Sequence, residues 1–306
     1  MPCFVCVQAC VAGKFKAAVG SEVCSGCDAG KFSLSAGASL CTDCQAGGTS
    51  TQGRSTCECS SGYESAVSRL GDHVMEFGGT SGDFVEVQQS SSINFVGKSF
   101  SWAVWARRAQ DSPDEYQIIL AFRSGWDSYS RLVVGYGGSG SVFIFDFYNN
   151  ALQATLPGDG KDKGVWVHWA GSYDKATKTR TLYRNGAAVA SDVSPSDLVS
   201  SSGNLGIGAY SGNGFKGRID DLLLLTRIVS ASEVSLIFRE QTLVDTTGLA
   251  LKFDFNEETG AVLDGSSNGN QGTLRGTCRR IQESDAQVPG RPCKVDDLIA
   301  CDPAMT

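Results

Sequence analysis

The chain has 306 residues, enough for about two domains of ordinary size. Hydrophobic residues make up 41% of it and charged residues 19%, so a packed core can form. The formal net charge is −7, which argues against a nucleic-acid partner, because such a partner selects a basic surface. No apolar run is long enough to span a membrane and no secretory signal is visible, so we expect no membrane insertion.

The twelve cysteines are distributed very unevenly. Nine lie in the first 59 residues, none lies between 60 and 277, and three follow: Cys3, Cys6, Cys10, Cys24, Cys27, Cys41, Cys44, Cys57 and Cys59, then Cys278, Cys293 and Cys301. This distribution predicts a cysteine-rich stalk over 1–66, a main domain over 67–275 and a disulfide-stapled tail over 276–306. We expect all twelve cysteines to be oxidised, which requires a secreted protein.

The cysteine-rich block is a repeat. The run Cys10-Val-Ala-Gly-Lys-Phe recurs at Cys27, and in weaker form at Cys44 and Cys59, with spacings of 17, 17 and 15 residues. Each unit is too short and too polar to bury a core, so it needs covalent crosslinks. A bridge closing a loop of about 14 residues contributes roughly 3 kcal/mol in the loop-entropy description. We predict the bridges Cys10–Cys24, Cys27–Cys41 and Cys44–Cys57.

Zinc is the alternative for the same cysteines. The spacing Cys24-x2-Cys27-x13-Cys41-x2-Cys44 suits a tetrahedral thiolate site. The longer repeat, however, uses Cys10 and Cys57 equally, and the block contains no histidine. We therefore favour disulfides. Residues 1–62 also resemble the cysteine-rich repeats of ephrin-receptor-like and tumour-necrosis-factor-receptor-like ectodomains, and this resemblance implies an extracellular or cell-surface location.

From about residue 70 short apolar or alternating runs are separated by Gly, Ser, Asn and Asp turns, which favours an antiparallel sandwich or barrel. Asn185-Gly186 indicates a type I′ hairpin, and Ser230-Ala-Ser-Glu233 is a capping box that begins a helix. The predicted strands are 73–77, 84–87, 100–106, 117–122, 131–136, 142–147, 166–173, 179–184, 187–192, 204–208 and 215–225.

A series of motifs in this region resembles laminin-G-like domains of the concanavalin A-like jelly-roll superfamily. They include Met75-Glu-Phe-Gly-Gly-Thr-Ser-Gly-Asp-Phe, Phe100-Ser-Trp-Ala-Val-Trp, Trp166-Val-His-Trp-Ala-Gly-Ser-Tyr-Asp and Phe215-Lys-Gly-Arg-Ile-Asp-Asp. The resemblance implies a mainly β fold of two stacked antiparallel sheets, extracellular, binding glycans or proteins and in some members calcium. Residues 249–275 resemble the opening segment of such a domain; here they form either a late strand or part of a neighbouring copy.

The sequence contains no recognisable set of catalytic groups. The two histidines, His73 and His168, are interpreted as structural, and no nucleophile elbow or zinc-protease motif occurs. Glycosidases need paired carboxylates, which the retaining glucanases of this fold carry on one strand in motifs like Glu-x-Asp-x-x-Glu. In the two best candidates here the first glutamate is replaced, by Lys252 two residues before Asp254 and by Arg218 two residues before Asp220. We expect no enzyme activity and no required cofactor.

Calcium is the one candidate metal. The resemblance places Asp83, Asp220 and Asp221 at acidic positions that family members use near a metal, and carboxylate oxygens suit Ca²⁺. The alternative, which we prefer, is that Asp83 caps a turn and Asp220 orders a loop. Three aromatic residues, Trp126, Tyr129 and Tyr136, are candidates for stacking on sugar rings, although we prefer core or edge packing for them.

Three functions follow from these observations. The first is a non-catalytic structural or adhesive protein, which assembles with copies of itself or with other extracellular proteins in a surface, matrix or filament. Its cysteine groups of nine and three cannot each pair internally, so a bridge must join the two ends or two chains. The alternative is a calcium-assisted, glycan-binding, lectin-like module, and a glycoside hydrolase ranks third.

Overall fold

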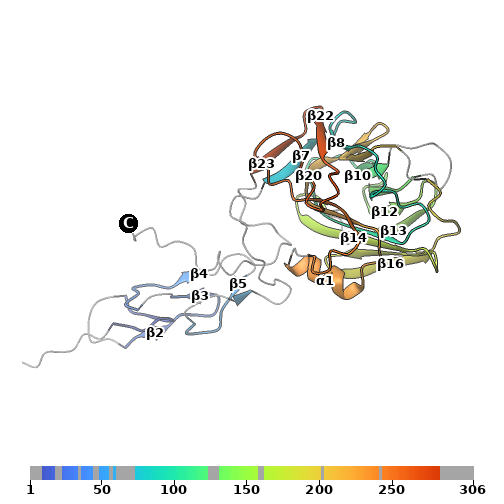
Figure 1. Cartoon of the computed structure of the whole chain (residues 1–306). Coiled ribbons are helices and arrows are strands. Elements are labelled where there is room, and N and C mark those ends of the chain that lie inside the picture. The colour runs from blue at the N-terminus through green and yellow to red at the C-terminus, as the bar shows by residue number, and fades with distance from the viewer. Residues whose placement is uncertain are drawn as a thin grey trace, which may run out of the picture. The chain divides into compact units, whose positions relative to one another are not determined.

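A computed structural model describes residues 9–17, 23–33, 36–43, 48–54, 58–59, 73–122, 131–157, 162–200, 203–240 and 243–282. The chain divides into two compact units, and Figure 1 shows the chain coloured from its N-terminus to its C-terminus. The first takes in Met1–Leu70 and is called the cysteine-rich unit; the second, Gly71–Gly290, is called the sandwich unit.

The cysteine-rich unit is built from two-residue strands paired in antiparallel ribbons. The pairs are β1 (Lys14–Phe15) with β2 (Ser25–Gly26), β3 (Lys31–Phe32) with β4 (Thr42–Asp43), and β5 (Gly48–Thr49) with β6 (Glu58–Cys59). Disulfide bonds join Cys10 to Cys24 and Cys27 to Cys41, which are two of the predicted pairings. A short ribbon of this kind has no stability of its own, so each bond fixes one ribbon.

The sequence repeat is also a repeat of hydrogen bonds. The amide of Gly13 donates to the carbonyl of Ser33 at 2.8 Å, and 17 residues later the amide of Gly30 donates to the carbonyl of Ser50 at 3.0 Å. Both glycines adopt positive φ, +83° and +82°, which L side chains rarely adopt. The glycine that recurs three residues after cysteine is thus explained by the positive φ of the backbone at that position. The amide of this glycine also joins each unit to the next by a hydrogen bond.

These bonds decide between the metal and disulfide alternatives. Three of the four cysteines in the zinc-like spacing, Cys24, Cys27 and Cys41, are in disulfides, so the zinc alternative is wrong in this structure. The predicted Cys44–Cys57 bond lies outside the described residues, as do Cys3, Cys6, Cys293 and Cys301, and the side chain of Cys59 is likewise not described.

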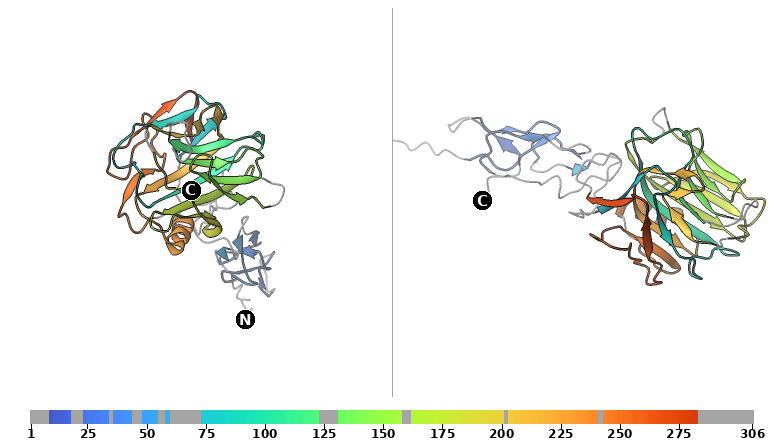
Figure 2. Two further views of the ribbon diagram at one scale, coloured as in Figure 1. Left: turned by 90° about the vertical axis from the view of Figure 1, so that its right-hand side faces the viewer. Right: turned by 90° about the horizontal axis from the view of Figure 1, so that it is seen from above.

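The sandwich unit consists of two antiparallel sheets (Figures 1 and 2). The seven-stranded sheet has the order β13 (Ala151–Thr155), β12 (Val142–Asp146), β11 (Val133–Tyr136), β10 (Gln117–Phe122), β17 (Leu205–Ile207), β8 (Phe84–Val87) and β22 (Gly272–Arg275). The eight-stranded sheet has the order β16 (Ala187–Val193), β15 (Thr179–Arg184), β14 (Trp166–Asp174), β9 (Phe100–Arg108), β20 (Lys216–Leu225), β7 (His73–Gly78) and β23 (Arg279–Gln282), and β21 (Leu249–Phe253) also pairs with β20. A small ribbon joins β18 (Ala209–Tyr210) to β19 (Asn213–Gly214).

This architecture confirms the predicted mainly β sandwich. All eleven predicted strands occur, and the bounds of β8, β10 and β15 are the predicted ones. Asn185 and Gly186 join β15 to β16 with φ of +49° and +80°, as a type I′ turn requires. The strand β13 was not predicted, because the run Ala-Leu-Gln-Ala-Thr carries little apolar signal.

The core lies between the sheets and is rich in aromatic rings. Phe143 of the seven-stranded sheet stacks on Trp169 of the eight-stranded sheet, with ring centroids 3.8 Å apart. Phe145 meets Trp102 edge to face at 5.6 Å. Because all four of these rings are fully buried, the two sheets are held by a large apolar area as well as by ring geometry.

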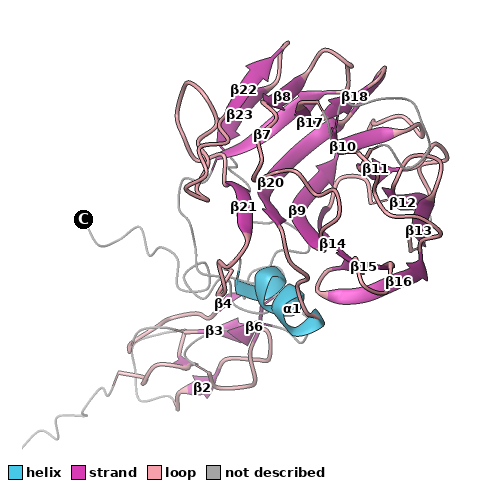
Figure 3. Cartoon of the chain, turned by 45° about the vertical axis from the view of Figure 1, so that its right-hand side comes forward, coloured by secondary structure: helices cyan, strands magenta, loops and turns pink. Residues whose placement is uncertain are grey.

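One helix, α1 (Ala231–Glu240), covers part of the outer face of the eight-stranded sheet (Figure 3). Its capping box is formed as predicted: the amide of Glu233 donates to Ser230 Oγ at 3.2 Å, and the amide of Ser230 donates to Glu233 Oε2 at 2.8 Å. Val234 and Ile237 pack on apolar residues of β20, and Phe238 lies 5.7 Å from the ring of Trp105.

The C-terminal segment completes both sheets. β21 pairs with β20, β22 with β8, and β23 with β7, so residues 249–275 are late strands of this same sandwich. β23 lies beyond residue 276, where the tail is predicted to begin, and its pairing with β7 extends the eight-stranded sheet to Gln282. Cys278 is a buried free thiol rather than a disulfide partner. Its Sγ lies 3.2 Å from the carbonyl of Arg275 and 3.4 Å from that of Phe84, and burial raises its pKa, so it behaves as a small core residue.

Strand β20 pairs with two partners along one edge. Its first half pairs with β7, from Lys216 to Ile219, and its second half pairs with β21, from Leu222. Between the halves the register with β9 shifts from Asp220 to Leu223, and Asp221 adopts a φ of +47°. This bulge changes the strand direction, as bulges do, and it explains how one strand serves both neighbours.

Candidate functional site

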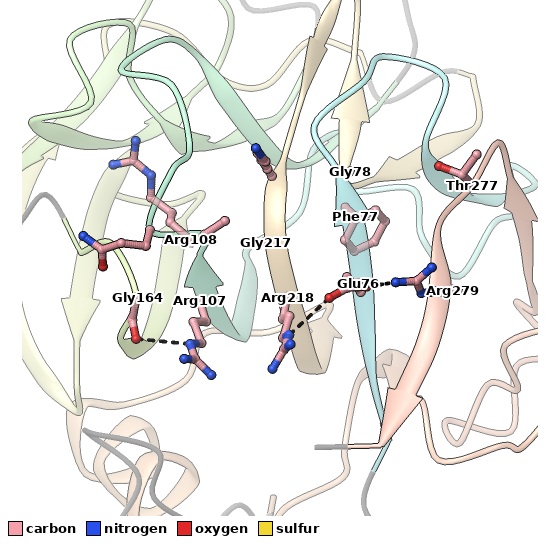
Figure 4. Close-up of a pocket in the computed structure, with 13 residues that line it drawn as sticks. Glu76, Phe77, Gly78, Arg107, Arg108, Gly164, Gly217, Arg218, Thr277 and Arg279 are labelled. Atoms are coloured by element: carbon pink, nitrogen blue, oxygen red, sulfur yellow. Dashed lines mark hydrogen bonds and ion pairs between the residues drawn. The ribbon is translucent and has the colours of Figure 1, made fainter. Parts of the chain in front are cut away.

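A pocket of about 500 Å³ lies on the eight-stranded sheet, where β9, β20, β7 and β23 meet (Figure 4). All of its lining residues belong to the sandwich unit. They are Glu76, Phe77, Gly78, Arg107, Arg108, Ala109, Gln110, Gly164, Lys216, Gly217, Arg218, Thr277 and Arg279. Five of these side chains are cationic and one is a carboxylate, so the lining has a net charge of +4, although the whole chain carries −7.

Strand register places four charged residues in one row across the sheet. Arg107 of β9 is paired with Arg218 of β20, Arg218 is paired with Glu76 of β7, and Glu76 is paired with Arg279 of β23. Paired residues in a sheet point to the same face, and Figure 4 shows these side chains side by side. We call this set the arginine row.

The arginine row is held by its own contacts. Both oxygens of Glu76 contact an arginine: Oε2 accepts a hydrogen bond from Arg279 Nη2 at 2.7 Å, and Oε1 forms an ion pair with Arg218 Nε at 3.5 Å. Arg107 Nε donates to the carbonyl of Gly164 at 3.1 Å. The side chains of Glu76 and Arg218 are 27% and 30% exposed and that of Arg279 is 71% exposed, so a ligand can reach the row.

The turn that carries Gly164 is fixed against β9. The amide of Gly164 donates to the carbonyl of Arg108 at 2.8 Å, while its carbonyl accepts from Arg107. Gly164 has a φ of +72°, and a Cβ there would lie 2.5 Å from Gln110 Oε1. The positive φ favours glycine at this position, and the Gly164 carbonyl orients the Arg107 guanidinium.

Two further cations line the pocket. Lys216 Nζ pairs with Asp111 at 2.6 Å on the exposed side. Arg108 is fully buried and donates to the carbonyls of Gly140 and Pro113, both at 3.1 Å, with its guanidinium 4.6 Å from the Tyr136 ring. Burial lowers the pKa of Arg108, while Tyr136, Asp114 and Asp162 oppose that effect, and an arginine remains charged at neutral pH.

The structure does not bring the three predicted calcium residues together. Asp83 precedes β8 and lies beside Gly78, whereas Asp220 is paired with Trp105 in β20. Lys216 is the partner of Gly78, so Asp220 lies four residues, or ~13 Å, further along that strand. Within the described ranges, no three His, Cys, Asp or Glu side chains form a group that could hold a metal ion. Calcium binding stays a prediction without a site there.

Asp83 instead anchors the C-terminal segment. Its Oδ1 accepts from the amide of Thr277 at 2.7 Å and from the Thr277 hydroxyl at 3.0 Å. Burial raises the pKa of Asp83, but hydrogen bonds from Thr277, Thr80 and Gly78 together lower it further, so the net shift is downward. Asp220 is also buried, and its Oδ1 accepts from the amide of Asp221 at 2.9 Å within the bulge. Both contacts fit the structural alternative.

The remaining predicted residues lie away from the pocket or in the core. His168 is buried between Trp105 and Phe238, at ring distances of 5.3 and 5.9 Å, and burial lowers its pKa to about 3. His73 is a strand residue whose amide donates to Asn256 Oδ1 at 3.0 Å. Tyr136 has no exposed surface and is a core ring, which confirms the packing interpretation that we prefer for it. Trp126 and Tyr129 lie outside the described residues.

Sequence reasoning missed the arginine row. Arg218 was considered only as the residue that replaces a catalytic glutamate, and Arg279 was assigned to the tail. The available signal was the alternation in Trp-Ala-Arg107 and in Lys-Gly-Arg218, which places both arginines on the same face as Trp105 and Asp220. Which strands are neighbours could not be obtained from that alternation.

Comparison with known proteins gives the family. A profile described as the concanavalin A-like lectin/glucanases superfamily matches residues 78–235, just over half of the chain. The chain belongs to this superfamily. The match covers most of the sandwich unit and none of the cysteine-rich unit, whose likeness to ephrin-receptor-like repeats is therefore not shown. No curated protein matches the sequence.

Solved structures show the same fold at low identity. A candidate carbohydrate-binding protein from Bacteroides ovatus is 18% identical with a TM-score of 0.54, over 70% of this chain and 61% of that one. The present chain thus spans about three fifths of that protein. A heptameric pentraxin from Limulus polyphemus (12% identity, TM-score 0.44, 69% and 95% covered) and domains LG4-5 of mouse laminin α1 (14%, 0.38, 52% and 42%) are more distant. In the described part of the chain, the one helix is too short and too polar to cross a membrane.

Proposed function

We propose that the sandwich unit is a lectin-like, glycan-binding module and that the pocket at the arginine row is its binding site. The observation that carries the proposal is this pocket of about 500 Å³, lined by polar groups and placed on a rigid sheet. Membership of the lectin/glucanase superfamily and the fold shared with the Bacteroides ovatus protein support it. Fold alone does not choose a ligand, so the argument depends on the pocket.

The pocket offers the groups that sugar hydroxyls need. Guanidinium N–H groups donate, and the Glu76 carboxylate and the Gly164 carbonyl accept. The Thr277 hydroxyl donates its proton to Asp83, so its oxygen is left as a further acceptor. The side chains of β7, β9 and β20 are fixed by strand pairing and by ion pairs before any ligand arrives. Such preorganisation limits the conformational entropy that binding would otherwise lose.

We propose that this binding is not coupled to hydrolysis. Glycosidases place two carboxyl groups about 5–9 Å apart across the scissile bond. The described lining of the pocket has a single carboxylate, Glu76, which is already in contact with two arginines. The site as described therefore lacks an acid and base pair.

We also propose that the protein works outside the cell. The disulfides Cys10–Cys24 and Cys27–Cys41 persist only in an oxidising compartment. In this proposal the cysteine-rich unit, which resembles ephrin-receptor-like repeats, is a covalently stapled spacer. Assembly into adhesive or filamentous material stays a prediction; a covalent form of it requires an inter-chain disulfide, which gels with and without reductant would reveal.

The test is a screen of the intact, oxidised chain against a broad array of oligosaccharides, followed by calorimetry on the best ligand. We expect at least one oligosaccharide to bind and the variant Arg218→Ala to weaken that binding about tenfold or more. Arg275→Gln is the matched control, because Arg275 pairs with Glu86 on the other sheet and should leave binding unchanged. A folded wild-type protein that binds nothing on the array would overturn the proposal.

A further inference from the structure

We infer that the glycan recognised at this pocket is anionic, carrying carboxylate or sulfate groups, and that the arginine row selects those groups. The inference rests on the proposed glycan-binding function and adds the chemical class of the ligand. It comes from the charge and register of the row.

The pairing of two arginines across neighbouring strands reduces the stability of the sheet. Arg107 and Arg218 are direct cross-strand partners on the same face of the sheet, and like charges directly opposite each other destabilise a sheet. The one carboxylate of the row, Glu76, lies beyond Arg218 and pairs with Arg218 and Arg279. The row therefore keeps a net charge of +2. A bound oxyanion between adjacent arginines would offset repulsion between them.

The charge of the pocket is opposite in sign to the net charge of the whole chain. The chain as a whole is acidic, at −7, while the pocket is lined by four cations that are not buried, Arg107, Lys216, Arg218 and Arg279, and by one carboxylate, Glu76. A cleft of one charge sign concentrates ligands of the opposite sign and speeds their association. A site for neutral sugars needs donors and acceptors, but it does not need four accessible cations. The excess charge is thus informative about the ligand.

The length of the arginine row indicates the shape of the ligand that it fits. Adjacent strands lie about 4.8 Å apart, so the three steps from Arg107 to Arg279 span ~14 Å along the row. Guanidinium groups bind carboxylate and sulfate-like oxyanions through parallel N–H donors. A row of this length fits an extended chain that carries more than one anion better than it fits a single small ion.

The lining also favours a glycan over a single-stranded nucleic acid. Proteins that bind such strands stack the bases on exposed aromatic rings. The one aromatic residue among the described lining residues is Phe77, which is only 2% exposed and belongs to the core. A nucleic acid would find charge here but no stacking surface.

The experiment measures the affinity of the full oxidised chain by calorimetry at 50 and 200 mM salt. The probes are a sulfated oligosaccharide, an oligouronate of the same length, a neutral oligosaccharide of that length, poly-glutamate and single-stranded DNA. We expect the sulfated or the carboxylated oligosaccharide to bind at least about tenfold more tightly than the neutral one, and to weaken as salt increases. The comparison of those two arms identifies the oxyanion.

Charge variants test the role of the row. Arg279→Gln should weaken binding of the anionic oligosaccharide about tenfold or more, and Arg218→Lys should recover part of the loss seen in Arg218→Gln because it keeps the charge. Glu76→Gln is the sharpest variant, since it removes the single negative charge and keeps a hydrogen-bond acceptor; it should tighten anion binding several-fold. A merely structural row would make Glu76→Gln bind more weakly. Arg275→Gln again serves as the matched control.

The outcomes separate this inference from the proposed function. Equal binding of neutral and anionic oligosaccharides, indifferent to the arginine variants, would overturn the anionic inference and leave glycan binding intact. Binding of poly-glutamate or DNA through the row, with no oligosaccharide bound, would overturn both. Melting temperatures of every variant, measured in parallel, show whether the loss of affinity in a variant is a loss of folding.

Discussion

Each of the two units of this protein is stabilised internally by a different kind of interaction. Among the described residues of the cysteine-rich unit, the buried apolar side chains are Cys10 and Cys27, and both are in disulfides. The sandwich unit buries Trp102, Trp105, Trp166 and Trp169 together with a continuous aliphatic and aromatic core. A segment with few apolar residues must limit its unfolded state by crosslinks, whereas a 200-residue sandwich gains enough from burial.

Reduction of the disulfides should therefore produce the largest difference in stability between the two units. Each described disulfide joins residues 14 apart, so each contributes roughly 3 kcal/mol and the pair about 6 kcal/mol. We expect dithiothreitol to make the cysteine-rich unit sensitive to protease while the sandwich stays resistant and keeps its tryptophan near-ultraviolet signal. Unchanged cleavage of a fully reduced first unit would refute the contrast.

A core truncation should have the opposite selectivity. Trp169→Ala removes the ring stacked on Phe143 and leaves a large cavity, which costs about 3–5 kcal/mol. The denaturant midpoint of the sandwich, followed by fluorescence of the remaining tryptophans, should fall accordingly. The protease resistance of the oxidised cysteine-rich unit should not change, and a loss there would show that the two units unfold as one.

Acid should act on the sandwich through His168. Because burial lowers its native pKa to about 3 while the unfolded value is near 6.5, the unfolded state binds an extra proton over that interval. Stability therefore falls as pH decreases below about 6.5, by about 2 kcal/mol between pH 6.5 and pH 5. His168→Phe should remove this part of the pH dependence. Denaturant titrations of both proteins at pH 7 and pH 5 measure it, and equal losses in the two would contradict the assignment.

Local patterns in the sequence predicted much of the fold. Strands such as Gln117–Phe122, the hairpin at Asn185 and the capping box at Ser230 depend on neighbouring residues, and the structure confirms each of them. The 17-residue repeat of glycine after cysteine likewise set the correct disulfide partners for Cys10 and Cys27. These features are encoded within a few residues of one another.

The candidate site depends on contacts that no local pattern contains. Glu76 and Arg279 are 203 residues apart, and Arg107 and Arg218 meet only because β9 and β20 are neighbours in a particular register. A shift of one residue in that register would move Arg218 to the opposite face of the sheet. The sequence thus predicted residues and faces, while the strand order that joins them had to come from the structure.

The late strands have a consequence for biosynthesis. β22 and β23 form the outermost strands beside β8 and β7, which lie near the start of the sandwich, so the last-made segment binds the first-made one. A nascent chain still on the ribosome holds β7 and β8 with one neighbour missing until Gln282 has emerged. Native closure of both sheets therefore waits for these late strands, and during that interval the exposed strand edges are where a chaperone would be needed.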